Sequence, residues 1–177
     1  MNKILLVDCD GTIRKPKSKA KVIDSPTDQE PIPGAIEAIN HYFQADWLIV
    51  GITNQANVAR GRKSLENCIK EQQYTLKLFP QIEAIYFCPD FEGKLCYCVQ
   101  RNSYEQKIAW QPGINFRKPG DGMIFRACID FNGGEHPDEA WMIGDRSEDE
   151  AAACSAGISF MDADIWRERW RTGKYRV

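Results

Sequence analysis

Four short runs of almost uninterrupted apolar residues punctuate the chain, and each gives way to polar residues. The runs cover residues 3–8, 47–52, 82–87 and 140–143. Because neighbouring residues of a strand point to opposite faces, a run that is apolar throughout is typical of a parallel strand covered by helices on both sides. We therefore expect these four runs to form the centre of a parallel sheet.

Between these runs, apolar residues recur at helical spacing. One helix is predicted after residue 34, and a longer one after Ser64, a favourable N-cap residue. Two more are expected after Pro119 and over about 146–155. This alternation predicts an α/β fold, a doubly wound (Rossmann-like) parallel sheet flanked by helices with right-handed crossovers. We expect one domain over residues 1–177, with no large cap domain.

Two polar segments interrupt this rhythm and are predicted to be loop insertions. Residues 13–33 contain four lysines and four prolines, which fits a solvated loop. Residues 88–117 are too long for an idle connection in a compact domain. The lysines of the first segment are Lys15, Lys17, Lys19 and Lys21.

Composition narrows the class of protein without pointing to a partner. The 177 residues carry a formal charge of -2, with 43% hydrophobic and 27% charged residues, which is ordinary for a globular protein and gives no overall attraction to nucleic acid. The apolar run near the N-terminus is too short for a signal peptide or a membrane span, so we expect a cytoplasmic location. In that reducing compartment, the seven cysteines fit core residues, metal ligands or redox groups better than disulfides.

Asp8 and Asp10 stand at the end of the first apolar run, followed at once by Gly11 and Thr12. Ligands of open α/β sheets bind at the carboxyl ends of the strands, so this is the expected place for chemistry. Two carboxylates this close repel each other and need a cation, a shared proton or a ligand. An Asx-type turn is the alternative interpretation of these residues.

Other polar groups are predicted to reach the same edge of the sheet. The segment 53–55 leaves the second strand, Lys118 precedes the third helix, and Asp145 and Asp149 stand where a later strand meets its helix. Spaced by four, these two aspartates lie on one face of a helix. Carboxylates from two strand ends suit a hard cation such as Mg²⁺, which shares its shell with phosphate.

The ordered set of these motifs resembles that of the haloacid dehalogenase-like phosphohydrolases. The resemblance implies a phosphatase that forms an aspartyl phosphate on Asp8, with Asp10 as general acid and base. It further implies that Thr53 binds the phosphate and Lys118 neutralises its charge. The implied Mg²⁺ ligands are Asp8, Asp10, Asp145 and Asp149.

One stretch narrows the resemblance within the family. Residues 53–61, "TNQANVARG", look very like a segment of heptose bisphosphate phosphatases, a branch that includes histidinol-phosphate phosphatases and the polynucleotide 3'-phosphatase domain. By this resemblance Asn54, Arg60 and Arg117 bind substrate. The alternative for both arginines is a solvated surface charge. Cys9 replaces an arginine that the sugar and histidinol enzymes carry there, which weakens the heptose assignment.

The cysteines of the second insertion resemble the structural zinc loop of the heptose enzymes. Three thiolates and one further ligand would complete a tetrahedral zinc shell. However, an aspartate stands where those enzymes have histidine, which leaves core or free thiols as the alternative. The candidate zinc ligands are Cys88, Asp90, Cys96 and Cys98. The remaining cysteines fit core positions: Cys9, Cys68, Cys128 and Cys154.

These observations predict a Mg²⁺-dependent phosphomonoesterase acting on a small phosphorylated metabolite such as a sugar phosphate. A nucleic-acid 3'-phosphatase is the second hypothesis, because the basic loop 13–33 and the tail 166–176, with interleaved Trp and Arg, could contact a polyanion. The tail also fits an amphipathic closing helix. A catalytically idle binding module is the third hypothesis, which the complete acidic set disfavours. No membrane partner is expected, and the chain is expected to be a monomer.

Overall fold

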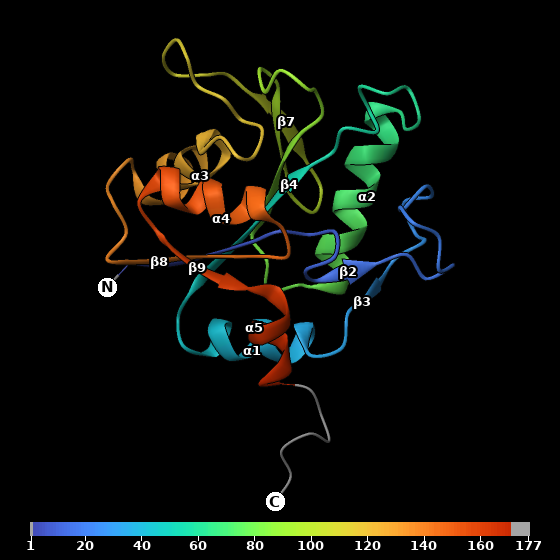
Figure 1. Cartoon of the computed structure of the whole chain (residues 1–177), viewed down its shortest axis with the longest axis horizontal. Coiled ribbons are helices and arrows are strands. Elements are labelled where there is room, and N and C mark those ends of the chain that lie inside the picture. The colour runs from blue at the N-terminus through green and yellow to red at the C-terminus, as the bar shows by residue number, and fades with distance from the viewer. Residues whose placement is uncertain (1, 171–177) are drawn as a thin grey trace, which may run out of the picture.

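A computed structural model describes residues 2–170 and shows a seven-stranded sheet in the order β7-β6-β5-β4-β1-β8-β9 (Figure 1). Strands β9, β8, β1, β4 and β5 run parallel, whereas β6 and β7 are antiparallel to their neighbours. The strands are β1 (Lys3–Val7), β4 (Leu48–Asn54), β5 (Ala84–Cys88), β6 (Cys96–Val99), β7 (Tyr104–Lys107), β8 (Glu139–Gly144) and β9 (Ser159–Asp162).

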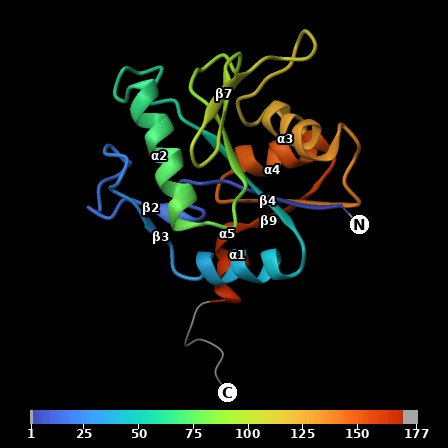
Figure 2. The same ribbon diagram turned by 180° about the vertical axis from the view of Figure 1, so that it is seen from behind.

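Helices cover both faces of the sheet, which confirms the doubly wound α/β fold. One face packs against α1 (Ala35–Gln44), α2 (Leu65–Leu78) and α5 (Ala163–Glu168), and the other against α3 (Gly122–Asn132) and α4 (Ser147–Ala156) (Figures 1 and 2). The apolar run of β1 accounts for this, because Leu5 and Val7 join one buried cluster and Ile4 and Leu6 the other.

The start of α2 and the bounds of two strands can be compared with the prediction from the sequence. The Ser64 hydroxyl accepts a hydrogen bond from the Asn67 amide at 3.1 Å, which makes Ser64 the N-cap of α2 as predicted. The strand predicted over 140–143 extends over β8, and that predicted over 82–87 begins two residues later, at Ala84.

The second insertion is more regular than a loop. Residues 88–117 contain β6 and β7, which add an antiparallel extension to the parallel sheet. The 13–33 segment likewise contains two very short antiparallel strands, β2 (Arg14–Lys15) and β3 (Glu30–Pro31). The sequence pattern also missed β9, and Cys154 is exposed rather than a core residue.

The parallel strands bring the polar motifs to one edge of the sheet. β1, β4 and β8 end at neighbouring positions, with Val7 paired to both Gly51 and Ile143. The residues that follow these strand ends therefore meet in space. None of the helices within residues 2–170 is long and apolar enough to span a membrane.

Candidate active site

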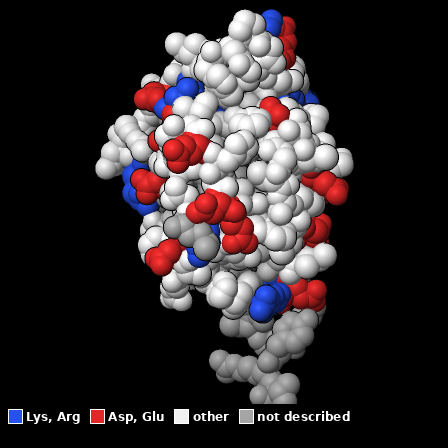
Figure 3. Space-filling model, turned by 90° about the vertical axis from the view of Figure 1, so that its left-hand side faces the viewer, with Lys and Arg blue, Asp and Glu red and all other residues white. Residues whose placement is uncertain are grey.

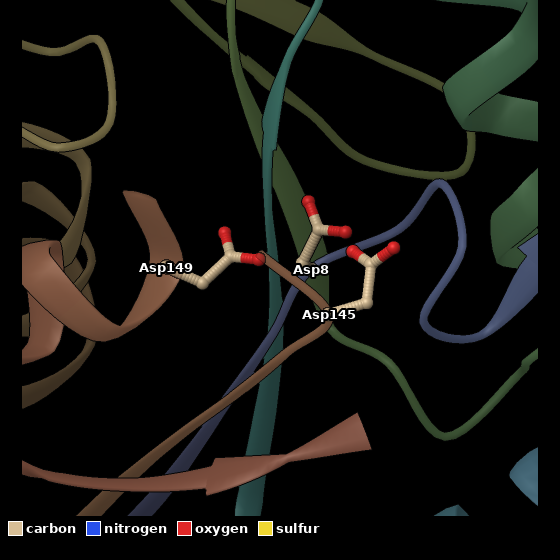
Figure 4. Close-up of side chains that lie close together, drawn as sticks. All are labelled: Asp8, Asp145 and Asp149. Atoms are coloured by element: carbon tan, nitrogen blue, oxygen red, sulfur yellow. The ribbon is translucent and has the colours of Figure 1, made fainter. Parts of the chain in front are cut away.

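Three carboxylates converge at this edge and form the acidic cluster of Asp8, Asp145 and Asp149. One oxygen of each lies within 4.8 Å of the others. Figure 4 shows Asp8 after β1, Asp145 after β8, and Asp149 in the first turn of α4. Asp8 and Asp149 are buried and Asp145 is exposed, so the cluster opens to solvent on one side.

Lys118 connects two members of the cluster. Its ammonium lies 2.6 Å from Asp8 Oδ1 and 2.6 Å from Asp149 Oδ1, and it donates to the Ile52 carbonyl at 3.0 Å. The ammonium therefore has three oxygen atoms around it, with hydrogen bonds to Asp8 Oδ1 and to the Ile52 carbonyl and an ion pair with Asp149. Lys118 is therefore fixed between the nucleophile candidate and Asp149.

The turn after β1 explains why Gly11 and Thr12 follow the two aspartates. Gly11 has φ +87°, and a Cβ there would lie 2.3 Å from Asp145 Oδ2, so only glycine allows this close approach. The Thr12 hydroxyl lies 3.1 Å from Asp8 Oδ2 and 3.4 Å from Asp145 Oδ1. The turn thereby positions two carboxylates of the cluster. Arg167, from α5, secures it by donating to the Gly11 carbonyl at 3.0 Å and to the Thr12 carbonyl.

The electrostatics of the cluster favour an additional cation. Burial raises the pKa of Asp8 to about 7, and the charge of Asp149 adds to this effect while Lys118 opposes it. The pKa of Asp145 is also raised, mainly by burial and then by Asp149. Lys118 stays protonated because Asp8 and Asp149 outweigh the effect of its burial and raise its pKa.

The donor set fits Mg²⁺. Three carboxylates face a single ammonium, which leaves an excess of two negative charges when all are ionised. Oxygen ligands and an open side for water or phosphate are what Mg²⁺ requires. Asp8, Asp145 and Asp149 are therefore the residues that would hold the ion.

Asp10 belongs to a different set of contacts. Its carboxylate accepts hydrogen bonds from Arg14 Nε at 2.9 Å and from Gln55 Nε2 at 2.7 Å. Desolvation raises the pKa of Asp10, but the charge and hydrogen bonding of Arg14, with smaller contributions from Gln55 and Lys63, together outweigh this effect, so the pKa lies below its ordinary value. The Asp10 side chain is not part of the acidic cluster, so the structure does not bring it together with the other predicted Mg²⁺ ligands.

The two residues at the end of β4 have separate contacts. Thr53 is buried, and its hydroxyl accepts a hydrogen bond from Gln55 Nε2 at 3.2 Å. The Asn54 amide binds the backbone of Lys118 at both ends, accepting from its N–H at 3.1 Å and donating to its carbonyl at 2.9 Å. This contact positions Lys118, while a role for Asn54 in substrate binding stays a prediction.

These groups line a cleft of about 440 Å³, which lies within the range of small-molecule sites. Arg60 and Arg117 both line it, and their guanidinium carbons lie 5.2 and 5.8 Å from the ring centre of the half-exposed Phe91. Sequence reasoning missed Phe91, whose ring lies close to both guanidinium groups at the cleft. Lys15 and Lys21 of the 13–33 segment line the cleft as well.

The structure does not support the zinc site. Within residues 2–170, the acidic cluster is the group of metal-ligating side chains that comes together, and the cysteines of the second insertion are not part of one. The Cys88 thiol donates to Asp90 Oδ1 at 3.1 Å, and the Asp90 carboxylate accepts from the amides of Lys94 at 2.9 Å and Leu95 at 3.2 Å. Hydrogen bonds to Asp90 thus hold the loop between β5 and β6 together. Cys96 and Cys98 pack in the core.

The tail gives little basis for contact with a polyanion. Arg167 is buried against the turn after β1, and Trp166 is buried in the core. The ring centres of Trp170 and of His41 in α1 lie 4.2 Å apart. The described part of the tail, which includes the end of α5, therefore packs against the body of the protein as a closing helix. Residues 171–176 lie outside the described residues. On the face seen in Figure 3, the described charges of both signs are scattered in small groups.

Sequence reasoning also missed the partners of Asp10. Gln55 stands two residues after Thr53, but its amide had no assigned role. The clearest sequence signal for a buried polar network is Glu71. It stands three residues after Cys68 and four before Thr75, so it lies on the buried side of α2. A carboxylate at such a position requires a buried partner.

Known proteins resemble this chain in sequence and in fold. The HAD-hydrolase-like family model matches residues 115–161. A D-glycero-beta-D-manno-heptose-1,7-bisphosphate 7-phosphatase of Pasteurella multocida is 29% identical over 163 residues, which span 89% of this chain and 79% of the relative. The D-glycero-alpha-D-manno-heptose-1,7-bisphosphate 7-phosphatase of Campylobacter jejuni is 29% identical over 160 residues, 88% of this chain and 78% of the relative.

A solved structure shares the fold. The D,D-heptose 1,7-bisphosphate phosphatase of B. bronchiseptica, complexed with magnesium and phosphate, superposes with a TM-score of 0.66 at 24% identity, over 89% of this chain and 78% of that one. In sequence the chain is thus similar to haloacid dehalogenase-like hydrolases over residues 115–161 and to heptose bisphosphate phosphatases over most of its length, and its fold is that of a solved phosphatase of this kind.

Proposed function

We propose that the chain is a Mg²⁺-dependent phosphomonoesterase that acts through an aspartyl phosphate on a small phosphorylated metabolite, a sugar phosphate. The observation that carries this proposal is the acidic cluster, in which three carboxylates and one ammonium meet at the base of a cleft. The relatives named heptose bisphosphate phosphatases support a sugar phosphate as substrate.

The positions of Asp8 and Lys118 suit nucleophilic attack on phosphorus. A phosphate monoester repels an approaching carboxylate, so positive charge must be in place beforehand. Mg²⁺, when bound, supplies charge neutralisation and orients the phosphate. Lys118 adds a fixed positive charge 2.6 Å from Asp8. The Asp8 carboxylate then forms a bond to phosphorus as the bond to the leaving oxygen breaks.

Asp10 provides the proton transfers in both steps. It gives a proton to the leaving oxygen, and as a carboxylate it takes one from the water that hydrolyses the aspartyl phosphate, releasing phosphate and free Asp8. Arg14 favours the carboxylate form of Asp10 that the second step uses. A phosphate dianion bound beside Asp10 raises the pKa of this group again, which favours the protonated form that the first step uses.

Arg60 and Arg117 form the part of the cleft that we assign to the remainder of the substrate. Guanidinium groups bind carboxylate or phosphate with two parallel hydrogen bonds, so they suit a second anionic or polar group. Both side chains line the cleft beside Phe91. Replacing either arginine by glutamine should chiefly raise KM.

A substrate screen with and without Mg²⁺ tests the proposal. Sugar phosphates, including both anomers of heptose 1,7-bisphosphate, and a 3'-phosphorylated oligonucleotide would be compared by phosphate release. We expect Mg²⁺-dependent turnover of a sugar phosphate, acid-stable phosphate labelling of the wild type, and loss of both in Asp8→Asn, with a rate loss of about 10⁴-fold or more. Efficient turnover of the oligonucleotide alone, or full activity of Asp8→Asn, would contradict the proposal.

A further inference from the structure

Asp10 lies in a closed ring of side chains, the Asp10 ring, in which Gln55, Lys63 and Glu71 have no role in the proposed reaction. Arg14 bridges two carboxylates, because Nε lies 2.9 Å from Asp10 Oδ1 while the terminal nitrogen Nη2 lies 2.9 Å from Glu71 Oε1. Glu71 uses its other oxygen for Lys63. Lys63 lies 3.4 Å from Gln55 Oε1, and Gln55 Nε2 returns to Asp10 Oδ2 at 2.7 Å.

The ring extends from the cleft, where Asp10 lies, to the buried side of α2, where Glu71 lies. Arg14, Glu71, Lys63 and Gln55 are all at least nine-tenths buried, whereas the Asp10 side chain is 41% exposed and lines the cleft. The ring has two carboxylates and two cations, so it is neutral when Asp10 is ionised. Thr75 and Gln29 complete the hydrogen bonding around Arg14.

Burying so many charges is costly, and apolar side chains of similar volume would fill the space at least as well. A closed ring with directed hydrogen bonds instead fixes the rotamer of each member. Both oxygens of Asp10 have partners in the ring, which leaves the carboxylate one orientation toward the cleft. Gln55 also donates to the Thr53 hydroxyl at 3.2 Å, so the same ring holds a second residue of the site.

We propose that Arg14, Glu71, Lys63 and Gln55 are positioning residues that hold Asp10 for proton transfer. The inference rests on the proposed function, because it assigns the ring to the acid and base of that reaction. Glu71 is the key member, since it alone anchors both cations of the ring. Acting through Asp10, the ring should govern kcat, while KM depends on the phosphate and arginine contacts elsewhere in the cleft.

Glu71→Gln tests the proposal, because the amide keeps the shape of the side chain but removes the charge that holds Arg14 and Lys63. We expect kcat to fall about 10- to 100-fold, the loss that follows when partners orienting functional side chains are removed, with KM changed less than about twofold. Glu66→Gln is the matched control. Glu66 stands in the same helix and pairs with Lys70 on the surface, so kcat should not change.

A double mutant separates positioning from general destabilisation. In an Asp10→Asn background, Glu71→Gln should cause little further loss, because the group that it positions is gone. Gln55→Met provides a second variant that leaves the Glu71 ion pairs intact, and it should show the same dependence on Asp10. An unchanged kcat in both variants, or the same fold loss with and without Asp10, would overturn the positioning role.

The outcome for Asp10→Asn alone distinguishes the two proposals. Full activity of Asp10→Asn would remove the acid–base role from the proposed function, and the positioning role would fail with it. An impaired Asp10→Asn beside fully active Glu71→Gln and Gln55→Met would refute the positioning role alone.

Discussion

The acidic cluster and the Asp10 ring are joined by the short segment from Asp8 to Asp10, yet their charges balance differently. The cluster has three carboxylates for the one ammonium of Lys118, whereas the ring has two carboxylates for two cations. Burial raises the pKa of Asp8, the nucleophile candidate, whereas Arg14, Gln55 and Lys63 hold the pKa of Asp10 below its ordinary value despite its desolvation. Two carboxylates that are two residues apart in the sequence therefore have opposite electrostatic surroundings.

This difference indicates what each region requires from outside the chain. An excess of negative charge is relieved by a cation from solvent, so the cluster is suited to a metal ion and a phosphate. A neutral ring with complete hydrogen bonds requires nothing further, and it is suited to holding a side chain in place. The contrast predicts that the two regions respond differently when a cation is removed or added.

Removing one lysine from each region should show the largest difference. Lys118→Met leaves Asp8 and Asp149 without their shared cation, so at pH 8 without Mg²⁺ the free energy of unfolding should fall by about 3–5 kcal/mol. Lys63→Met should lower it by only about 1–3 kcal/mol, since Glu71 retains Arg14 at 2.9 Å. Urea denaturation measures both values. Equal losses would contradict the proposed difference in charge balance.

Adding Mg²⁺ should stabilise the protein through the cluster alone. At about 100 times its Kd, a ligand that binds only the native state adds about 2.7 kcal/mol, which corresponds to a rise in Tm of about 5–10 °C. Asp145→Asn should abolish this rise and Glu71→Gln should preserve it, as thermal scans with and without Mg²⁺ would show. A rise that persists in Asp145→Asn would place the ion elsewhere.

The cluster was predictable from the sequence because it depends on strand ends. Asp8, Thr53 and Asp145 each follow an apolar run, and parallel strands bring such positions to one edge. The fold class followed from the same runs. Lys118 lies outside a strand, and the ordered motifs of the family identified it.

The ring was not predictable, because its members come from separate segments whose pairing depends on tertiary packing. Arg14 belongs to the 13–33 segment that was predicted to be a solvated loop, and Lys63 directly follows the charged residue Arg62, yet both side chains are buried. β7 was missed for a related reason, since the residues of Tyr104–Lys107 are mostly polar and exposed and show no apolar alternation. The sequence placed Arg167 in a tail that could contact a polyanion or form a closing helix, and its actual partners were not predictable because these carbonyl groups lie more than 150 positions earlier in the chain.

The loop after β5 provides a third and smaller test. In this loop the hydrogen bonds of Asp90, rather than a metal ion, hold the backbone and the Cys88 thiol in place. Asp90→Ala removes the acceptor of the Lys94 and Leu95 amides and of the Cys88 thiol, so the free energy of unfolding should fall by about 1–2 kcal/mol. Glu92→Gln is the control, because Glu92 pairs with Lys94 on the surface. Elemental analysis should find no stoichiometric zinc in protein purified without chelator. Zinc that is present in the wild type and lost in Asp90→Ala would mean that this loop, like the acidic cluster, depends on a cation.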